Sequence, residues 1–184
     1  MNQDGSAVSG LTRSEKVVVT AATEIPVTAV AAFRAPIEAV FDYIVAEDTP
    51  PKMMLGYGPV PGVAGGEIHE GPWDHPGAYR TVHLEGGGTA REQITAIRRP
   101  GYFSYRVSDF SISARYVVAA ARGEWWFETQ GDSTLVRWSY TFEPTSLPKA
   151  PLTFTLARLL WKGYMGRAMP EAKAQAEDAS RRAG

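Results

Sequence analysis

Hydrophobic and polar residues alternate along positions 78–110, and two short turns, Gly86-Gly87-Gly88 and Pro100-Gly101, divide this stretch into three strands. Such alternation is typical of strands with one buried face, and short turns determine which residues of neighbouring strands lie opposite each other. We predict that Glu92 lies opposite Val82 in the first hairpin and opposite Asp109 in the second. The predicted inner face consists of Arg80, Val82, Leu84, Ala90, Glu92, Ile94, Ala96, Phe103, Tyr105, Val107 and Asp109.

This inner face is mostly apolar, yet it carries three charged residues, Arg80, Glu92 and Asp109. A face that only packs against a core rarely holds charges, because burying a charge costs free energy unless it is paired. A face that lines a ligand cavity can hold them. The pattern therefore favours a cavity on this side of the sheet.

A second hairpin follows at positions 124–142, with Gly131-Asp132 at its turn. Glycine and aspartate suit the left-handed backbone that a two-residue hairpin turn needs. Pairing across this turn places Trp125 opposite Trp138 on one face and leaves charged residues on the other. We expect Trp126, on the outer face, to stack on Arg137.

Helical spacing dominates the two ends of the chain. After a strand at 27–33, apolar residues between Ile37 and Ile44 recur every three or four positions and predict a helix that begins near Pro36. A short helix at 52–55 follows. At positions 151–180 a long helix is predicted, with Leu152, Leu156 and Leu160 on one side; Pro170 is expected to kink or break it.

The predicted order is one strand, two short helices, about six antiparallel strands and a long C-terminal helix. A curved sheet with one apolar face needs a cover, and only the terminal helix is long enough to provide it. We predict an α+β helix-grip fold, with the sheet wrapped around the C-terminal helix. Residues 1–14 are expected to form a disordered tail, and residues 15–184 a single domain.

Composition narrows the possible functions. The 184 residues carry a formal charge of −1 without a long basic run, which argues against nucleic-acid binding. Without cysteine, the chain has no disulfide, thiolate catalysis or cysteine-bound metal. No apolar run approaches the ~20 residues of a membrane span, and the first residues do not resemble a secretory signal. We expect a cytoplasmic protein, monomeric or homodimeric, with no stable membrane insertion.

Three sequence stretches carry a family resemblance: FRAPIEAVFDYI at 33–44, GAYRTVHLEGG with REQITAIRRPGYFSYRV at 77–107, and GEWWFETQGDSTLVRWSYTFEP at 123–144. They resemble the SRPBCC superfamily, also called START or Bet v 1-like, and in particular its polyketide cyclase/dehydrase and lipid-transport branch. The resemblance implies a cavity for a hydrophobic small molecule between the sheet and the long helix. Some members are cyclases, dehydratases or hydrolases, but the family has no invariant catalytic residue to transfer.

The candidate catalytic residues are Glu92, Asp109, Arg80 and Tyr105. Two carboxylates in a partly dry cavity, one of them beside a guanidinium, can differ in acidity and serve as an acid/base pair without a cofactor. Such a pair suits enolisation, aldol cyclisation or dehydration. The alternative is a structural salt bridge at the cavity edge, with Asp109 turned outward.

Candidate ligand contacts are the apolar and aromatic residues of the inner face, residues of the terminal helix and two methionines expected at the entrance. They are Val82, Ile94, Phe103, Val107, Trp125, Trp138, Tyr140, Leu156, Leu160, Arg167, Met53 and Met54. Plain core packing explains most of them equally well. Arg167 neutralises an acidic group of the ligand, reaches solvent, or pairs with Glu171.

Three functions remain open. The first is binding of a hydrophobic or aromatic small molecule, polyketide-like or lipid-like, without a metal or cofactor. The second is a cyclase or dehydratase on the same scaffold, which would use the candidate catalytic residues. The third is a carrier that docks on membranes through the apolar start of the terminal helix, where Arg158 and Lys162 accompany the leucines.

Overall fold

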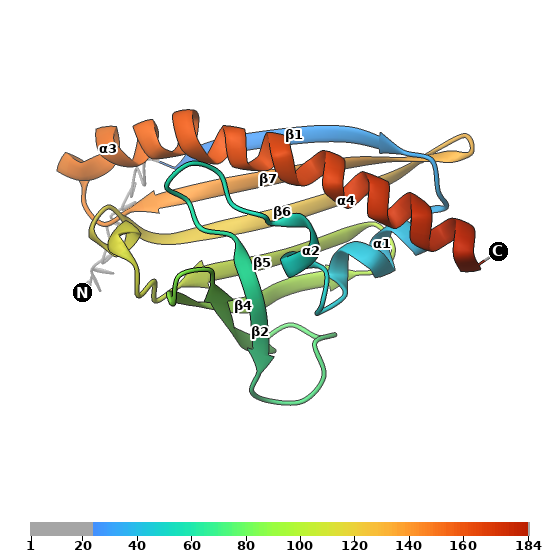
Figure 1. Cartoon of the computed structure of the whole chain (residues 1–184), viewed down its shortest axis with the longest axis horizontal. Helices are drawn as coiled ribbons and strands as arrows, with labels where there is room; N and C mark the ends of the chain where they lie inside the picture. The colour runs from blue at the N-terminus through green and yellow to red at the C-terminus, as the bar shows by residue number, and fades with distance from the viewer. Residues whose placement is uncertain (1–23, 184) are drawn as a thin grey trace, which may run out of the picture.

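The computed structural model describes residues 24–183 (Figure 1), so the predicted tail at 1–14 and the start of the domain at 15 lie outside the described residues. Strands, helices and short helical turns follow one another along this part of the chain. They are β1 (Ile25–Phe33), α1 (Ile37–Val45), α2 (Pro50–Met53), β2 (Val63–Ile68), β3 (Tyr79–Leu84), β4 (Thr89–Arg98), β5 (Tyr102–Ser108), η1 (Ser113–Tyr116), β6 (Val118–Gln130), β7 (Ser133–Pro144), η2 (Leu147–Lys149), α3 (Ala150–Thr155), η3 (Leu156–Trp161) and α4 (Lys162–Ala183).

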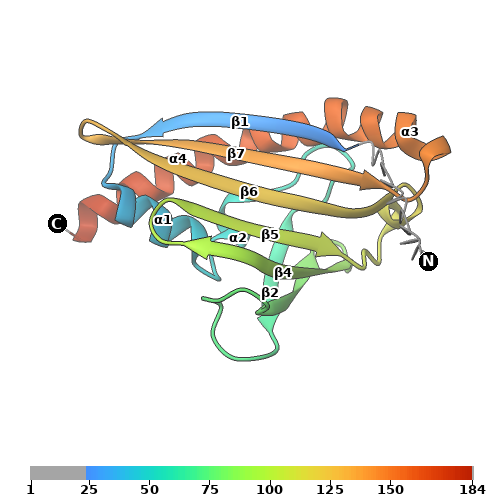
Figure 2. The same ribbon diagram turned by 180° about the vertical axis from the view of Figure 1, so that it is seen from behind.

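Within these residues seven strands form one antiparallel sheet in the order β1-β7-β6-β5-β4-β3-β2. Helix α4 crosses one face of the sheet, and α1 and α2 cover the same face beside it (Figure 1). Seen from behind, the other face has no helix over it (Figure 2). The predicted α+β helix-grip fold is confirmed, including the two short helices after the first strand.

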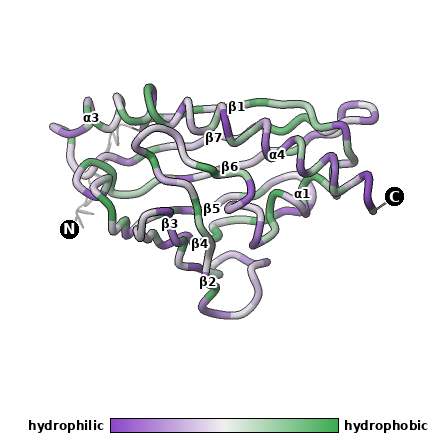
Figure 3. Tube along the Cα trace, viewed as in Figure 1, coloured by the Kyte–Doolittle hydropathy of each residue, from purple (hydrophilic) through white to green (hydrophobic). Residues whose placement is uncertain are grey.

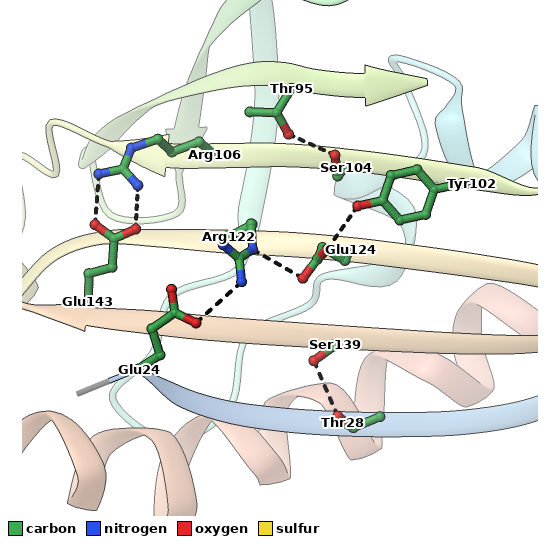
Figure 4. Close-up of polar contacts among 10 residues, drawn as sticks. All are labelled: Glu24, Thr28, Thr95, Tyr102, Ser104, Arg106, Arg122, Glu124, Ser139 and Glu143. Carbon is green, nitrogen blue, oxygen red and sulfur yellow. Dashed lines mark hydrogen bonds and ion pairs between the residues drawn. The ribbon is translucent and has the colours of Figure 1, made fainter. Parts of the chain in front are cut away.

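The bare face of the sheet carries a network of polar side chains (Figure 4). Tyr102 donates a hydrogen bond of 2.8 Å to Glu124, which also accepts one of 3.1 Å from Arg122. Arg106 forms an ion pair with Glu143 two strands away. Because this face satisfies its polar groups in contact with water, only the opposite face needs an apolar cover.

The second predicted hairpin is confirmed. Trp125 pairs with Trp138 across β6 and β7, and their rings stack with centroids 4.6 Å apart. On the outer face the Arg137 guanidinium lies 4.2 Å from the centre of the Trp126 ring. Stacked aromatic pairs of this kind stabilise neighbouring strands without any ligand.

The predicted register of the first meander is wrong by two positions. Glu92 pairs with Arg80 rather than with Val82, and on its other side with Val107 rather than with Asp109. The first turn closes one residue earlier than expected, with Leu84 donating a hydrogen bond to the carbonyl of Gly88. In the second hairpin the turn is one residue longer on one side, and a bulge between Ile94 and Ala96 shifts β4 against β5.

The bulge also changes which residues of β4 face inward. Beyond it Ala96 pairs with Ser104, whose hydroxyl bonds Thr95 on the outer face, so the expected inward position of Ala96 is wrong. Ile97 pairs with the buried Phe103 and packs against the core in its place. An extra residue in one strand reverses the side on which every later side chain lies.

The C-terminal helix runs from Ala150 to Ala183 and changes form along the way, with the π-helical segment η3 between α3 and α4. Helix α4 continues through Pro170, so the predicted break is wrong. Proline leaves the carbonyl four residues earlier without its donor. That carbonyl belongs to the exposed Gly166, where water can bind it.

Hydropathy differs between the two parts of this helix. Hydrophilic residues gather toward its C-terminal end, and apolar ones toward η3 (Figure 3). Leu152 is 60% exposed, although its spacing predicted burial beside Leu156 and Leu160. Among residues 24–183, no helix is both long enough and apolar enough to cross a bilayer.

Candidate functional site

A cavity of about 280 Å³ lies between the sheet and the C-terminal helix, toward the end of the sheet where η1 and η3 lie. Its floor comes from β3 to β7, its roof from η3 and α4, and its side walls from residues 59–61 and 110–117. Pro59 and Ser113 line the cavity and are themselves exposed, so the cavity opens between these two walls. Its volume approaches the range typical of small-molecule sites.

The structure brings together at this cavity many of the residues singled out from the sequence. They are Val82, Glu92, Tyr105, Val107, Tyr140, Leu156, Leu160 and Met54. Period-two spacing in the strands and four-residue spacing in the helix place all of them except Met54, which follows α2, on one inner surface. The inward parity assigned to them from the sequence is therefore observed.

Other predicted residues lie elsewhere. Ile94 and Trp138 are buried in the core and do not line the cavity. Met53, Phe103 and Trp125 line a smaller cavity of about 30 Å³, next to the first and separated from it by Glu92 and Tyr105. All five pack within the hydrophobic core, and the last three also face the smaller cavity.

Two of the predicted charged residues lie outside the site. Asp109 is exposed at the end of β5 with φ of 54°, a left-handed conformation that aspartate tolerates better than most residues. Its expected place opposite Glu92 on the inner face is wrong. Arg167 is also exposed, in agreement with the expectation that it reaches solvent. It donates a hydrogen bond of 3.3 Å to the Gly56 carbonyl, and it neither lines the cavity nor pairs with Glu171.

Glu92 forms a buried ion pair with Arg80. The guanidinium donates to both carboxylate oxygens at 3.1 and 3.2 Å, and the two side chains are only 5% (Arg80) and 9% (Glu92) exposed. Arg80 also donates to the Glu47 carbonyl at 3.1 Å and lies 4.3 Å from the centre of the Trp73 ring. Glu92 is thus both a partner in a structural ion pair and the carboxylate that lines the cavity.

Two tyrosines lie beside this carboxylate because a glycine makes room for them. Gly123 of β6 pairs with Tyr105 on one side and with Tyr140 on the other. A side-chain carbon at position 123 would come within 2.2 Å of the Tyr105 ring, so only glycine lets this ring lie over the strand. The Tyr105 and Tyr140 rings lie 6.3 Å apart in an edge-to-face arrangement.

Burial governs the ionisation of both phenols. Desolvation, and after it the negative charge of Glu92, raises the pKa of Tyr105 far above its ordinary value. Desolvation likewise raises the pKa of Tyr140. Both hydroxyls therefore stay protonated at neutral pH, the form that can donate a hydrogen bond.

The roof of the cavity is aromatic. Trp161 of η3 stacks on Tyr164 at 4.7 Å, with only 7° between the ring planes, and lies 4.5 Å from Tyr140 of β7. Its ring also meets Phe142 edge-on at 5.4 Å. These flat rings offer stacking surfaces to a planar ligand.

One wall was not predicted, because it comes from the Gly/Pro-rich segment between α2 and β2. Tyr57 lies so close to Gly163 that a side chain there would collide with its ring at 2.4 Å. Tyr164 donates to the Met54 carbonyl at 3.3 Å, and Arg167 holds Gly56 as described. The segment is thereby fixed against α4 (Figure 1), and Pro59, Val60 and Pro61 form the wall.

A second unpredicted wall is formed by residues that follow β5. Phe110, Ile112 and Val117 line the cavity around the short turn η1. The sequence signal that could have indicated this wall is the group of apolar residues in an irregular stretch, because residues of a loop that lies only on the surface are mostly polar. Chemically, the whole site is an apolar chamber with one oriented carboxylate and two neutral phenols at its floor.

Comparison with known proteins agrees with this architecture. A family model described as polyketide cyclase / dehydrase and lipid transport matches residues 24–177. Among curated protein sequences, none matches this chain.

Several solved structures share the fold. Major latex-like protein 151 from Panax ginseng (ginseng) is 14% identical with a TM-score of 0.61, over 83% of this chain and 97% of that one. A Thalictrum norcoclaurine synthase mutant, in complex with a transition-state analogue, is 10% identical with a TM-score of 0.63, over 84% and 95%. XoxI from Bacillus cereus is 16% identical with a TM-score of 0.61, over 84% and 96%.

At these identities the structural neighbours establish the fold alone. The family model covers most of the chain, including every strand and the greater part of α4. The resemblance drawn from the sequence is therefore confirmed, and the chain belongs to the polyketide cyclase/dehydrase and lipid transport family of the SRPBCC, or Bet v 1-like, superfamily.

Proposed function

We propose that this protein binds an apolar, aromatic small molecule in the cavity between the sheet and the C-terminal helix. The observation that carries the proposal is a chamber of about 280 Å³ whose walls are almost entirely apolar. The stacked rings of Trp161 and Tyr164 suit a planar ligand, and Glu92 with the Tyr105 and Tyr140 hydroxyls suits one polar group on it.

A cavity-filling substitution tests this proposal. Ala90 is buried at the cavity floor, so Ala90→Phe places a ring where the ligand would lie. The probe is N-phenylnaphthylamine, a neutral aromatic dye that fluoresces in apolar surroundings. We expect the wild type to bind the dye and Ala90→Phe to lose at least about tenfold in affinity, because the space is filled.

The matched control is Ala32→Phe, which adds the same ring at an exposed position of β1. It should bind the dye as the wild type does. Equal affinity of all three proteins would place the dye outside the cavity and contradict the proposal. Loss of dye binding by Ala32→Phe would also contradict the proposal, because an added phenylalanine on the surface would then lower dye affinity without filling the cavity.

A second candidate function is catalysis in the same chamber, and one observation favours it. Glu92 faces the cavity while Arg80 holds both of its oxygens, so the carboxylate has a fixed orientation toward a bound ligand. In a cofactor-independent cyclisation or dehydration Glu92 would accept the proton, and Tyr105 would donate a hydrogen bond to the developing oxyanion. Asp109 does not enter this scheme, because it is exposed.

Glu92→Gln separates the two functions. An enzyme should lose turnover of an aromatic polyketide-type ketone while dye affinity stays within about twofold, since glutamine keeps the shape but cannot take the proton. A carrier should show no turnover in either form. Retained dye binding also shows that the variant folds. Tyr105→Phe tests separately whether the Tyr105 hydroxyl contributes to turnover.

A further inference from the structure

The end of the molecule at α3 and η3 exposes several large apolar side chains. Leu152 is 60% exposed and Leu159 is 68% exposed, and Leu147 and Phe154 are exposed nearby. Scattered apolar residues are common on protein surfaces, but here four of them fall within residues 147–159. We call this group the α3 apolar set.

The α3 apolar set continues directly into the roof of the cavity. Leu152 of α3 and Leu159 of η3 lie within four residues of Leu156 along the chain. Leu156 lines the cavity, while Leu152 before it and Leu159 after it are exposed. The exposed leucines therefore lie in the same helical segment as the cavity roof, on its outward side.

The charge within this helical segment is of one sign. Residues 144–170 contain Lys149, Arg158, Lys162 and Arg167 but no aspartate or glutamate, although the whole chain has a net charge of −1. Arg115 of η1 is also exposed at the cavity wall. None of these five cations forms an ion pair with any carboxylate in residues 24–183.

This charge decides between the possible partners of the surface. A second copy of the chain in a two-fold dimer would bring the same patch against itself, and its cations would repel each other. An anionic lipid surface offers the opposite charge to the lysines and arginines and an apolar layer to the leucines.

We propose that the α3 apolar set and its flanking cations dock this protein on an anionic lipid surface. In that orientation Leu152 and Leu159 enter the interface, and Arg158 and Lys162 meet the lipid headgroups. The cavity roof at Leu156 then lies next to the membrane, where apolar molecules are dissolved. The docking does not depend on the proposed function, because it involves only the outer surface.

Co-sedimentation of the full chain with vesicles tests the proposal. One set of vesicles contains equal parts of phosphatidylcholine and phosphatidylserine, and the other contains phosphatidylcholine alone. We expect binding to the first set only, weakened by added salt. Arg158→Glu/Lys162→Glu should reduce it at least about 25-fold, since each cation near such a surface accounts for about fivefold. Leu152→Ser/Leu159→Ser should reduce it at least about tenfold.

Matched controls lie elsewhere on the surface. Val30→Ser removes an apolar side chain that is 57% exposed on β1, and Arg91→Glu/Arg98→Glu makes the same change of charge at exposed positions of β4. Both controls should bind the vesicles as the wild type does. A uniform loss across controls and test variants would overturn the proposal, because net charge alone would then explain it.

Two other results would also overturn it. One is a wild type that stays in solution with both kinds of vesicle. The other is a wild-type dimer, measured by light scattering, that Leu152→Ser/Leu159→Ser converts to monomers, because the surface would then be an interface between copies. Ala90→Phe should still bind vesicles, so failure of cavity binding and failure of docking can be told apart.

Discussion

Replacing Arg80 with methionine would leave the Glu92 carboxylate buried without its partner. Both side chains are almost fully buried, and the guanidinium supplies two hydrogen bonds to the carboxylate at 3.1 and 3.2 Å. Methionine has a similar length and fits beside the Trp73 ring, so the change removes charge and hydrogen bonds more than it removes volume. The variant therefore reports on the ion pair itself.

We expect Arg80→Met to lower the free energy of unfolding by about 3–5 kcal/mol, the usual cost of leaving one partner of a buried pair uncompensated. Removing both charges in Arg80→Met/Glu92→Met should cost far less. The desolvation of two charges offsets most of their attraction, so an apolar pair of similar size is often neutral or stabilising. The double variant should lie within about 1–2 kcal/mol of the wild type.

Urea unfolding followed by tryptophan fluorescence measures these differences, with the denaturant slope checked for each protein. Thr81→Met serves as a control on the same strand with its side chain on the outer face, and it should change stability little. The reasoning would be refuted if the single variant lost less than about 1 kcal/mol, or if the double variant were as unstable as the single one.

Three further predictions concern packing and pH. Gly123→Ala should cost about 1–3 kcal/mol in unfolding experiments by displacing the Tyr105 ring, and less in a Tyr105→Leu background; equal costs would contradict the contact. Hydrogen bonds from Arg106 lower the pKa of Glu143, so this pair stabilises the fold above the unfolded pKa of about 4.3. Near neutrality the wild type should be more stable than Arg106→Met by at most about 1 kcal/mol. In acid denaturation this difference should vanish as pH falls through the lowered pKa of Glu143. A difference that persists below that pKa would contradict the stabilising effect of the pair. Because burial raises the pKa of Tyr140 in the folded state, stability should fall as pH rises above about 10, where the unfolded phenol ionises. Tyr140→Phe should make this decline shallower in alkaline unfolding followed by phenolate absorbance, and an unchanged slope would exclude Tyr140 as a cause.

Much of the fold could be predicted because periodic patterns report which side of an element is buried. The Trp125–Trp138 pair follows from alternation and from a turn whose residues allow one tight geometry. The first hairpin was less predictable, since a run of three glycines permits several turns. A slip of one residue in that turn moved the partner of Glu92 from Val82 to Arg80, which turned a diagonal contact into a direct ion pair.

The candidate site was predicted only in part, for two physical reasons. The bulge after Ile94 has no sequence signature, yet together with the turn it changes the partner of Glu92 from Asp109 to Val107. The cavity walls at 59–61 and 110–117 come from irregular segments whose position depends on contacts far along the chain, such as Tyr57 against Gly163. Local patterns identify faces of elements, but tertiary contacts decide which loops enclose a cavity.

The cavity reduces the stability of the fold, because the side chains around it do not fill the space. Volume among apolar side chains that the chain itself does not fill costs about 24 cal/mol per Å³, so a chamber of about 280 Å³ forgoes about 7 kcal/mol of possible stability. A larger residue at Ala90 would fill part of it. Gly123 likewise leaves room, because the Tyr105 ring lies over its backbone. A small residue thus stands at position 90, where a larger one would fill the space, and the proposed binding of an apolar ligand gives a physical reason to keep that space.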